Sequence, residues 1–146
     1  MVELDPGLAA RARATADQLG LAGVTVTCAD AGITDGYAGI VPADVVLACG
    51  VFGNVSDDDV ARTIAALPSL CARGATVIWT RATADDRDVI ALIRRALADA
   101  GFAEVALHAP VDETFRVGMN RLTRPPAPYR AGVRMFRFVG QSERRR

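Results

Sequence analysis

The sequence predicts an α/β fold with a mostly parallel sheet, and three observations predict it. Segments with the apolar period of strands alternate along the chain with segments that have the period of helices. Residues 45–49 are continuously apolar, which is typical of a central parallel strand covered on both faces. Side chains suited to capping stand at the starts of the expected helices. We therefore expect one domain over residues 1–140 and a polar C-terminal tail over residues 141–146.

The first elements follow from local signals. Residues 2–4 form a short expected strand. Asp5 can cap the helix that follows, Pro6 suits its first position, and Gly20 can end it. Residues 24–28 then alternate between apolar and polar side chains, which predicts a second strand.

The middle of the chain continues this alternation. After the strand at residues 45–49, Ser56 can cap a helix whose acidic first turn, residues 57–59, is favoured by the helix macrodipole. A strand over residues 75–80 and a helix that begins at Thr83 come next.

The pattern changes near the C-terminus. Residues 115–122 and residues 133–139 both resemble strands, but the proline-rich segment 125–128 joins them instead of a helix. This predicts a C-terminal antiparallel hairpin of these two strands.

Composition restricts the class of protein. The 146 residues are 51% hydrophobic and 23% charged, and 17 basic side chains balance 17 acidic ones. Such values are typical of soluble globular proteins, and nothing in them favours nucleic acid as a partner. No apolar run reaches the ~18 residues of a membrane span, and the first residues do not resemble a signal peptide. Three widely spaced cysteines suit neither a disulfide framework nor a zinc site, so we expect a cytoplasmic protein with no metal.

Candidate binding residues stand at the carboxyl ends of the expected strands, where open parallel sheets bind ligands. Glu3 could accept both hydroxyl protons of a ribose, or be an exposed residue beside a helix start. Asp30 could accept a hydrogen bond from an exocyclic amine, with the N–H of Ala31 facing a ring nitrogen, or simply occupy a turn. Gly50 would allow close approach of a ligand, or be an ordinary loop glycine.

In this order, these residues resemble class I S-adenosylmethionine-dependent methyltransferases from the second strand of that family onward. Residues 2–6, 28–31 and 43–57 carry most of the resemblance, and residues 73–76 resemble the family's glycine turn into its fifth strand. The resemblance implies a Rossmann-like methyltransferase sheet. It also implies a chain truncated at its N-terminus, without the family's first strand and the glycine-rich loop that wraps the methionine end of the cofactor.

The resemblance further implies a set of binding residues for S-adenosyl-L-methionine. They are, in chain order, Glu3, Leu4, Asp30, Ala31, Cys49 and Gly50. The cofactor's ribose would lie at the first of these positions, its adenine at Asp30 and Ala31, and its amino-acid part at the backbone of the last two. Phe52 and Asn54 would lie on the substrate side. No catalytic residue is implied, because Gly53 and Asn54 replace the histidine pair of many relatives.

The expected activity is methyl transfer from S-adenosylmethionine to a small-molecule acceptor. Holding donor and nucleophile in line can supply much of the rate of this reaction without a dedicated base. Two alternatives remain open: a nicotinamide-dependent Rossmann oxidoreductase, and a non-catalytic methyltransferase-like fragment. A missing first strand would leave strand edges unpaired, and an oligomer could form through them.

The remaining residues of interest are expected to be structural. His108 is the only histidine, and a surface or packing role suits it better than a catalytic one. Trp79, Phe136 and Phe138 lie in strand patterns and are expected in the core.

Overall fold

The computed structural model describes residues 1–82, 87–110 and 113–139, so the expected helix start at Thr83 and the expected tail at residues 141–146 lie outside the described residues. The chain forms two compact units: Met1–Gly39 with Arg130–Arg134, and Ile40–Tyr129 with Met135–Arg146. One domain over residues 1–140 stays a prediction. Among the described residues, no helix has the length and apolar character needed to cross a membrane.

The N-terminal unit contains a short parallel ladder and one long helix. Strand β1 (Val2–Glu3) pairs with β2 (Thr27–Cys28), and helix α1 (Pro6–Gln18) lies between them in the chain. Strand β2 is shorter than the alternation over residues 24–28 predicts. Val24 belongs to a turn instead, because its N–H donates to the carbonyl of Leu21 at 3.0 Å.

The capping residues of α1 are those that the sequence predicts. The carboxylate of Asp5 accepts a hydrogen bond from the N–H of Leu8 at 2.8 Å, and Pro6 occupies the first helical position. Gly20 follows the helix with a φ of 65°, a left-handed conformation that favours glycine at a helix end.

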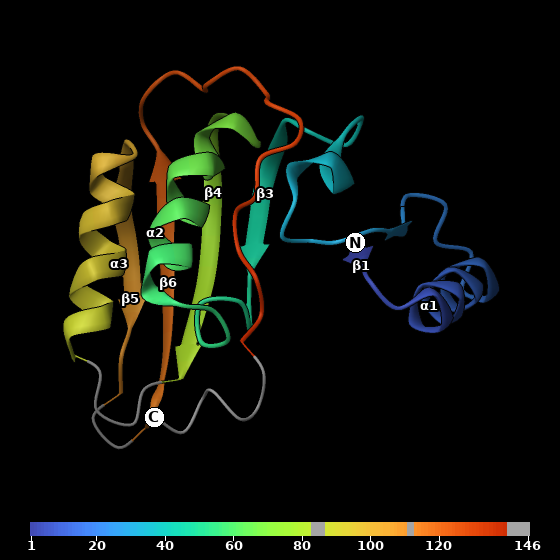
Figure 1. The fold of residues 1–146 in the computed structure, drawn as a ribbon, viewed down its shortest axis with the longest axis horizontal. Coiled ribbons are helices and arrows are strands. Elements are labelled where there is room, and N and C mark those ends of the chain that lie inside the picture. The colour runs from blue at the N-terminus through green and yellow to red at the C-terminus, as the bar shows by residue number, and fades with distance from the viewer. Residues whose placement is uncertain (83–86, 111–112, 140–146) are drawn as a thin grey trace. The chain divides into compact units, whose positions relative to one another are not determined.

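The C-terminal unit is a four-stranded sheet with two helices on one face (Figure 1). Its strands, in spatial order, are β3 (Ala43–Ala48), β4 (Cys71–Ala82), β6 (Phe115–Leu122) and β5 (Phe102–His108). Its helices are α2 (Asp57–Ala66), with a 3₁₀ turn at Leu67–Ser69, and α3 (Arg87–Asp99). Strands β3 and β4 are parallel, while β6 is antiparallel to both of its neighbours. The sheet is therefore mixed, and the prediction of a mostly parallel sheet is wrong for this unit.

The antiparallel hairpin is also made of other strands than the sequence predicts. Its partners are β5 and β6, and residues 133–139 form no strand apart from an isolated bridge between Arg134 and Ile33. The prolines at positions 125, 126 and 128 have no N–H to donate. Residues 135–139 instead bond to α2 and to the loop before it, as described below.

The core of the C-terminal unit lies between the sheet and its two helices. Its largest fully buried side chains include Trp79, Phe52, Ile64, Ile93, Leu97, Met135, Val60 and Val77. The indole N–H of Trp79 donates to Oδ1 of Asn120 at 2.9 Å, which satisfies a polar atom inside this core. Phe136 is also buried, as expected, but Phe138 is 60% exposed, so its prediction as a core residue is wrong.

The second face of this sheet has no helix from the described part of its own unit. Val45 and Leu47 of β3 are 55% and 65% exposed, and no helix in the described part of this unit lies on their face (Figure 1). In what is described of this unit, helices cover only one face of residues 45–49, so their coverage on both faces stays a prediction.

Candidate functional site

The N-terminal unit brings two of the candidate acids to the same end of its ladder. Glu3 is the last residue of β1 and pairs with Cys28, the last residue of β2, and Asp30 follows two positions later. Because the strands are parallel, their carboxyl ends lie side by side. Glu3 and Asp30 therefore both lie at the carboxyl end of the β1–β2 ladder, as the sequence predicts.

Glu3 takes part in the turn that leads into α1. Its Oε1 accepts a hydrogen bond from the N–H of Asp5 at 2.9 Å, while Leu4 between them is exposed. Among the described residues, Oε1 is the only carboxylate oxygen of Glu3 with such a bond. The other oxygen can therefore accept a bond from a ligand hydroxyl.

Asp30 is held by a cation that the sequence does not point to. Its Oδ2 lies 2.6 Å from Nη1 of Arg134, and its Oδ1 accepts a bond from the N–H of Gly32 at 2.8 Å. The hydroxyl of Tyr37 donates to the carbonyl of Ala31 at 2.9 Å. Burial raises the pKa of Tyr37, and the charge of Asp30 raises it further, so the phenol stays a donor.

This arrangement limits what Asp30 can do. A carboxylate oxygen has two lone pairs, so a carboxylate of this kind can bind several donors, among them an exocyclic amine. The carboxylate has partners within the protein, however, because it binds the guanidinium of Arg134 and the N–H of Gly32. Both readings of Asp30, ligand contact and structural turn, are compatible with this geometry.

In the C-terminal unit, the loop after β3 is folded on itself and tied to β4. Gly50 has a φ of 71°, and its N–H donates to Oγ1 of Thr80 at 2.9 Å. The side-chain amide of Asn54 donates to the carbonyl of Gly50. A Cβ at Gly50 would meet nothing within 4 Å, so the backbone conformation and not lack of space favours glycine there. Cys49, just before it, is exposed.

Phe52 belongs to the core. Its ring is fully buried and lies 6.3 Å from the ring of Trp79, measured between centroids. The guanidinium of Arg81 donates to its carbonyl. A contact between Phe52 and a substrate would therefore involve the backbone of Phe52 and not its ring.

The segment of residues 135–139, which we call the C-terminal strap, is fastened to α2 and to this loop. The N–H of Val139 donates to the carbonyl of Asn54 at 2.9 Å. The hydroxyl of Thr63 is shared between the carbonyl of Asp59 at 2.7 Å and the carbonyl of Met135 at 3.2 Å. Met135 and Phe136 are buried. The strap thus reaches the residue that sequence analysis places on the substrate side.

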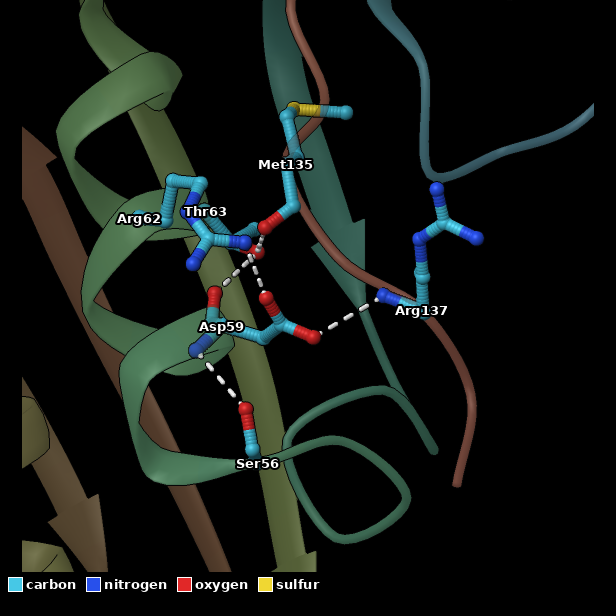
Figure 2. A network of polar contacts seen from close by, with 6 residues as sticks. All are labelled: Ser56, Asp59, Arg62, Thr63, Met135 and Arg137. Carbon is cyan, nitrogen blue, oxygen red and sulfur yellow. Dashed lines mark hydrogen bonds and ion pairs between the residues drawn. The ribbon is translucent and has the colours of Figure 1, made fainter. Parts of the chain in front are cut away.

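Asp59 is the centre of this attachment (Figure 2). Its Oδ2 accepts a bond from the N–H of Arg137 at 3.0 Å, and its Oδ1 is paired with the guanidinium of Arg62. Asp59 is only 8% exposed, although it lies in the first turn of α2, where its N–H also donates to Oγ of Ser56 at 3.2 Å. The sequence suggests only a helix-dipole role for Asp59.

The remaining candidates lie apart from these contacts. His108 ends β5 and is exposed. Cys28 and Cys49 are exposed free thiols, while burial raises the pKa of the Cys71 thiol to about 11. Within the described residues, no three histidine, cysteine or acidic side chains come together as a metal site.

The predicted site is thus distributed over both units. Glu3, Leu4, Asp30 and Ala31 belong to the N-terminal unit, and residues 49–54 to the C-terminal unit. A single cleft bordered by Glu3, Asp30 and Gly50 stays a prediction from the sequence.

Comparison with known proteins supports the fold. No protein-family model matches the chain, and no curated protein matches it in sequence. Its structure is similar to that of a methyltransferase from Pyrococcus furiosus, with a TM-score of 0.59 and 14% identity over 84% of this chain. It is also similar to a possible exported protein from Bordetella parapertussis, with a TM-score of 0.63 and 17% identity over 86% of this chain. The chain covers 60% and 52% of the lengths of these two structures.

Proposed function

We propose that the complete protein transfers a methyl group from S-adenosylmethionine to a small-molecule acceptor. The observation that carries this proposal is the structural similarity to the Pyrococcus furiosus methyltransferase over 84% of the chain. The two acids at the carboxyl ends of the adjacent strands β1 and β2 support it, because open sheets bind ligands at that end. A cytoplasmic location, with exposed free thiols at Cys28 and Cys49, is part of the same proposal.

The residues present fit the polar groups of the cofactor in part. Glu3 has a carboxylate oxygen to offer to a ribose hydroxyl, and Asp30 supplies a carboxylate of the kind that binds an amine. Gly50 presents backbone without a Cβ beside Cys49, where the amino-acid part of the cofactor would lie. When bound, the cofactor supplies a methyl group on a sulfonium.

The role of this chain in the transfer would be to position the reactants. The cofactor would supply the methyl group, and residues of this chain would bind and orient the acceptor that receives it. The loop at residues 50–54, bonded to Thr80 and to the C-terminal strap, would hold the acceptor in line with the breaking bond. Asn54 would lie beside the acceptor as a polar contact.

Calorimetric titration of the 146-residue chain with S-adenosylhomocysteine tests this proposal. We expect measurable binding, weaker binding by the Glu3→Gln variant, and no binding of NADH at the same concentration. Glu104→Gln is a control, since Glu104 pairs with Arg94 on the sheet of the C-terminal unit. Absence of heat at millimolar S-adenosylhomocysteine would favour the non-catalytic fragment, and tight binding of NADH would favour the oxidoreductase.

A further inference from the structure

The peptide that joins Cys49 to Gly50 is held by a side chain of the neighbouring strand. Its N–H, which belongs to Gly50, donates to Oγ1 of Thr80 at 2.9 Å. Thr80 directly follows Trp79, and Trp79 pairs with Ala48 at the end of β3, so the hydroxyl lies where the loop begins. Because β4 is itself paired on both sides, with β3 and with β6, Thr80 is a firm point of attachment for this peptide.

This attachment determines where the carbonyl of Cys49 points. The peptide is trans, and in a planar trans peptide the N–H and the C=O point in opposite directions. Because the N–H is directed at Thr80, the carbonyl of Cys49 is directed away from that hydroxyl. No donor in the described part of the chain is bonded to this carbonyl. A carbonyl oriented in this way can accept a hydrogen bond from a ligand amine or ammonium group.

The following peptide is fixed by a different side chain. The amide of Asn54 donates to the carbonyl of Gly50, and the carbonyl of Asn54 accepts the N–H of Val139 at 2.9 Å. The loop therefore keeps two of its ties if the hydroxyl of Thr80 is removed. Removal of that hydroxyl should release the peptide between Cys49 and Gly50 without unfolding the rest of the loop.

We propose that Thr80 is a positioning residue for the amino-acid end of the cofactor, an inference that rests on the proposed function. Thr80 acts through Cys49 and not by contact, because its hydroxyl aims the Cys49 carbonyl at the ammonium group of that end. An ammonium group has only donors, so it binds only where an acceptor faces it. Hydrogen bonds with a charged partner are stronger than neutral ones, so the orientation of this one carbonyl affects affinity.

Two nucleosides separate this role from a general effect on the fold. S-adenosylhomocysteine carries the amino-acid end, and methylthioadenosine has the same adenosine and sulfur without it. In calorimetric titrations, Thr80→Val should weaken S-adenosylhomocysteine about tenfold, the order expected for one hydrogen bond to a charged group, and leave methylthioadenosine nearly unchanged. Thr80→Ser should restore the affinity, because serine keeps the hydroxyl.

The matched control is Thr76→Val, which makes the same change on the same face of β4, four residues earlier in the strand. It should leave the affinities for both nucleosides unchanged. An equal loss of affinity in Thr76→Val and Thr80→Val would overturn the proposal, and so would a failure of Thr80→Ser to restore binding.

Hydrogen exchange tests the attachment without a ligand. In the unmodified chain the amide of Gly50 should exchange at least about tenfold more slowly than in an unstructured peptide. Its exchange should accelerate in Thr80→Val and remain slow in Thr80→Ser. If the Gly50 amide of the unmodified chain exchanges as in an unstructured peptide, the proposal is wrong, even where Thr80→Val does not fold.

The titrations also distinguish failure of this inference from failure of the proposed function. An unmodified chain that binds neither nucleoside at millimolar concentration would refute the proposed function and the role of Thr80 with it. If the unmodified chain binds both and Thr80→Val weakens both equally or neither, the proposed function stands and Thr80 does not position the amino-acid end.

Discussion

At the scale of single residues, the strictest requirement in the C-terminal unit is the absence of a side chain at Gly118. A Cβ built there would lie 2.1 Å from Cε2 of Trp79, which is fully buried and bonded to Asn120. The ring cannot move aside without giving up its buried hydrogen bond or displacing the neighbouring core.

We therefore expect Gly118→Ala to lower the free energy of unfolding by about 1–3 kcal/mol or more, the usual cost of overpacking. Urea denaturation followed by Trp79 fluorescence measures the change. Gly53→Ala is the control, because a Cβ at Gly53 would meet only Cδ of Arg81 at 4.0 Å. Equal stability of both variants would show that the Trp79 site can relax.

The buried thiol of Cys71 gives a second residue-scale prediction, on pH. Burial raises its pKa from 9.0 to about 11, so between these values the folded chain keeps a proton that the unfolded chain releases. The contribution of Cys71 to stability is thus fully present below pH 9, and it is lost as the pH rises toward 11, by up to ~1.4 kcal/mol per pH unit. Denaturation curves at pH 8 and pH 10.5 should show the loss in the native chain and a smaller loss in Cys71→Ala. An equal loss in both would assign the pH effect to other groups.

The sequence predicts polar contacts only where the partners are local, while the candidate binding residues stay a prediction. Asp5 and Ser56 cap their helices as expected, since each bonds to an N–H three residues away. Asp59 also accepts a bond from a residue 78 positions away in the chain, and Asp30 pairs with one 104 positions away. No local pattern encodes such pairs, so the strap and the Asp30–Arg134 ion pair were missed.

At the scale of elements, the same limit explains the error at residues 133–139. Their alternation suits a strand, but a strand needs a ladder partner, and here the polar groups of the strap bond to Thr63, Asp59 and Asn54 instead. Helices were predicted better than strands because caps and period define a helix within its own sequence. The pairing of β6 with both β4 and β5 has no such local signal.

The strap provides the prediction for this scale. Asp59→Ala removes the acceptor for the N–H of Arg137 and leaves Arg62 without its carboxylate, so we expect a loss of about 1–3 kcal/mol in stability. Hydrogen exchange of the Arg137 and Val139 amides should accelerate more than exchange in β4. Asp58→Ala is the matched control, since Asp58 shares the first turn of α2 but is exposed. Similar exchange rates in both variants would show that Asp59 does not hold the strap and acts only on the dipole of α2.

At the scale of the whole molecule, the two units differ in how much apolar surface they bury. Ala9 and Ala16 are the only buried hydrophobic side chains of the N-terminal unit among the described residues. Its ladder joins strands of two residues each. The C-terminal unit contains Trp79, Phe52 and the apolar faces of α2 and α3. Since a larger apolar core resists local opening better, stability should be unevenly distributed along the chain.

Native-state hydrogen exchange measures this distribution directly. We expect the amides of α1 to exchange through low-energy local opening, within about 1–2 kcal/mol of free exchange, and those of β4 and β6 to approach the global free energy of unfolding. Adding S-adenosylhomocysteine should slow exchange at Glu3 and Asp30 first, if these residues bind it, because a ligand stabilises the conformation that it occupies. NADH serves as the control ligand. Uniform protection of α1 and β4 in the chain without ligand would contradict the unequal division of stability between the two units, and it would mean that the N-terminal unit draws its stability from more than its own two buried alanines.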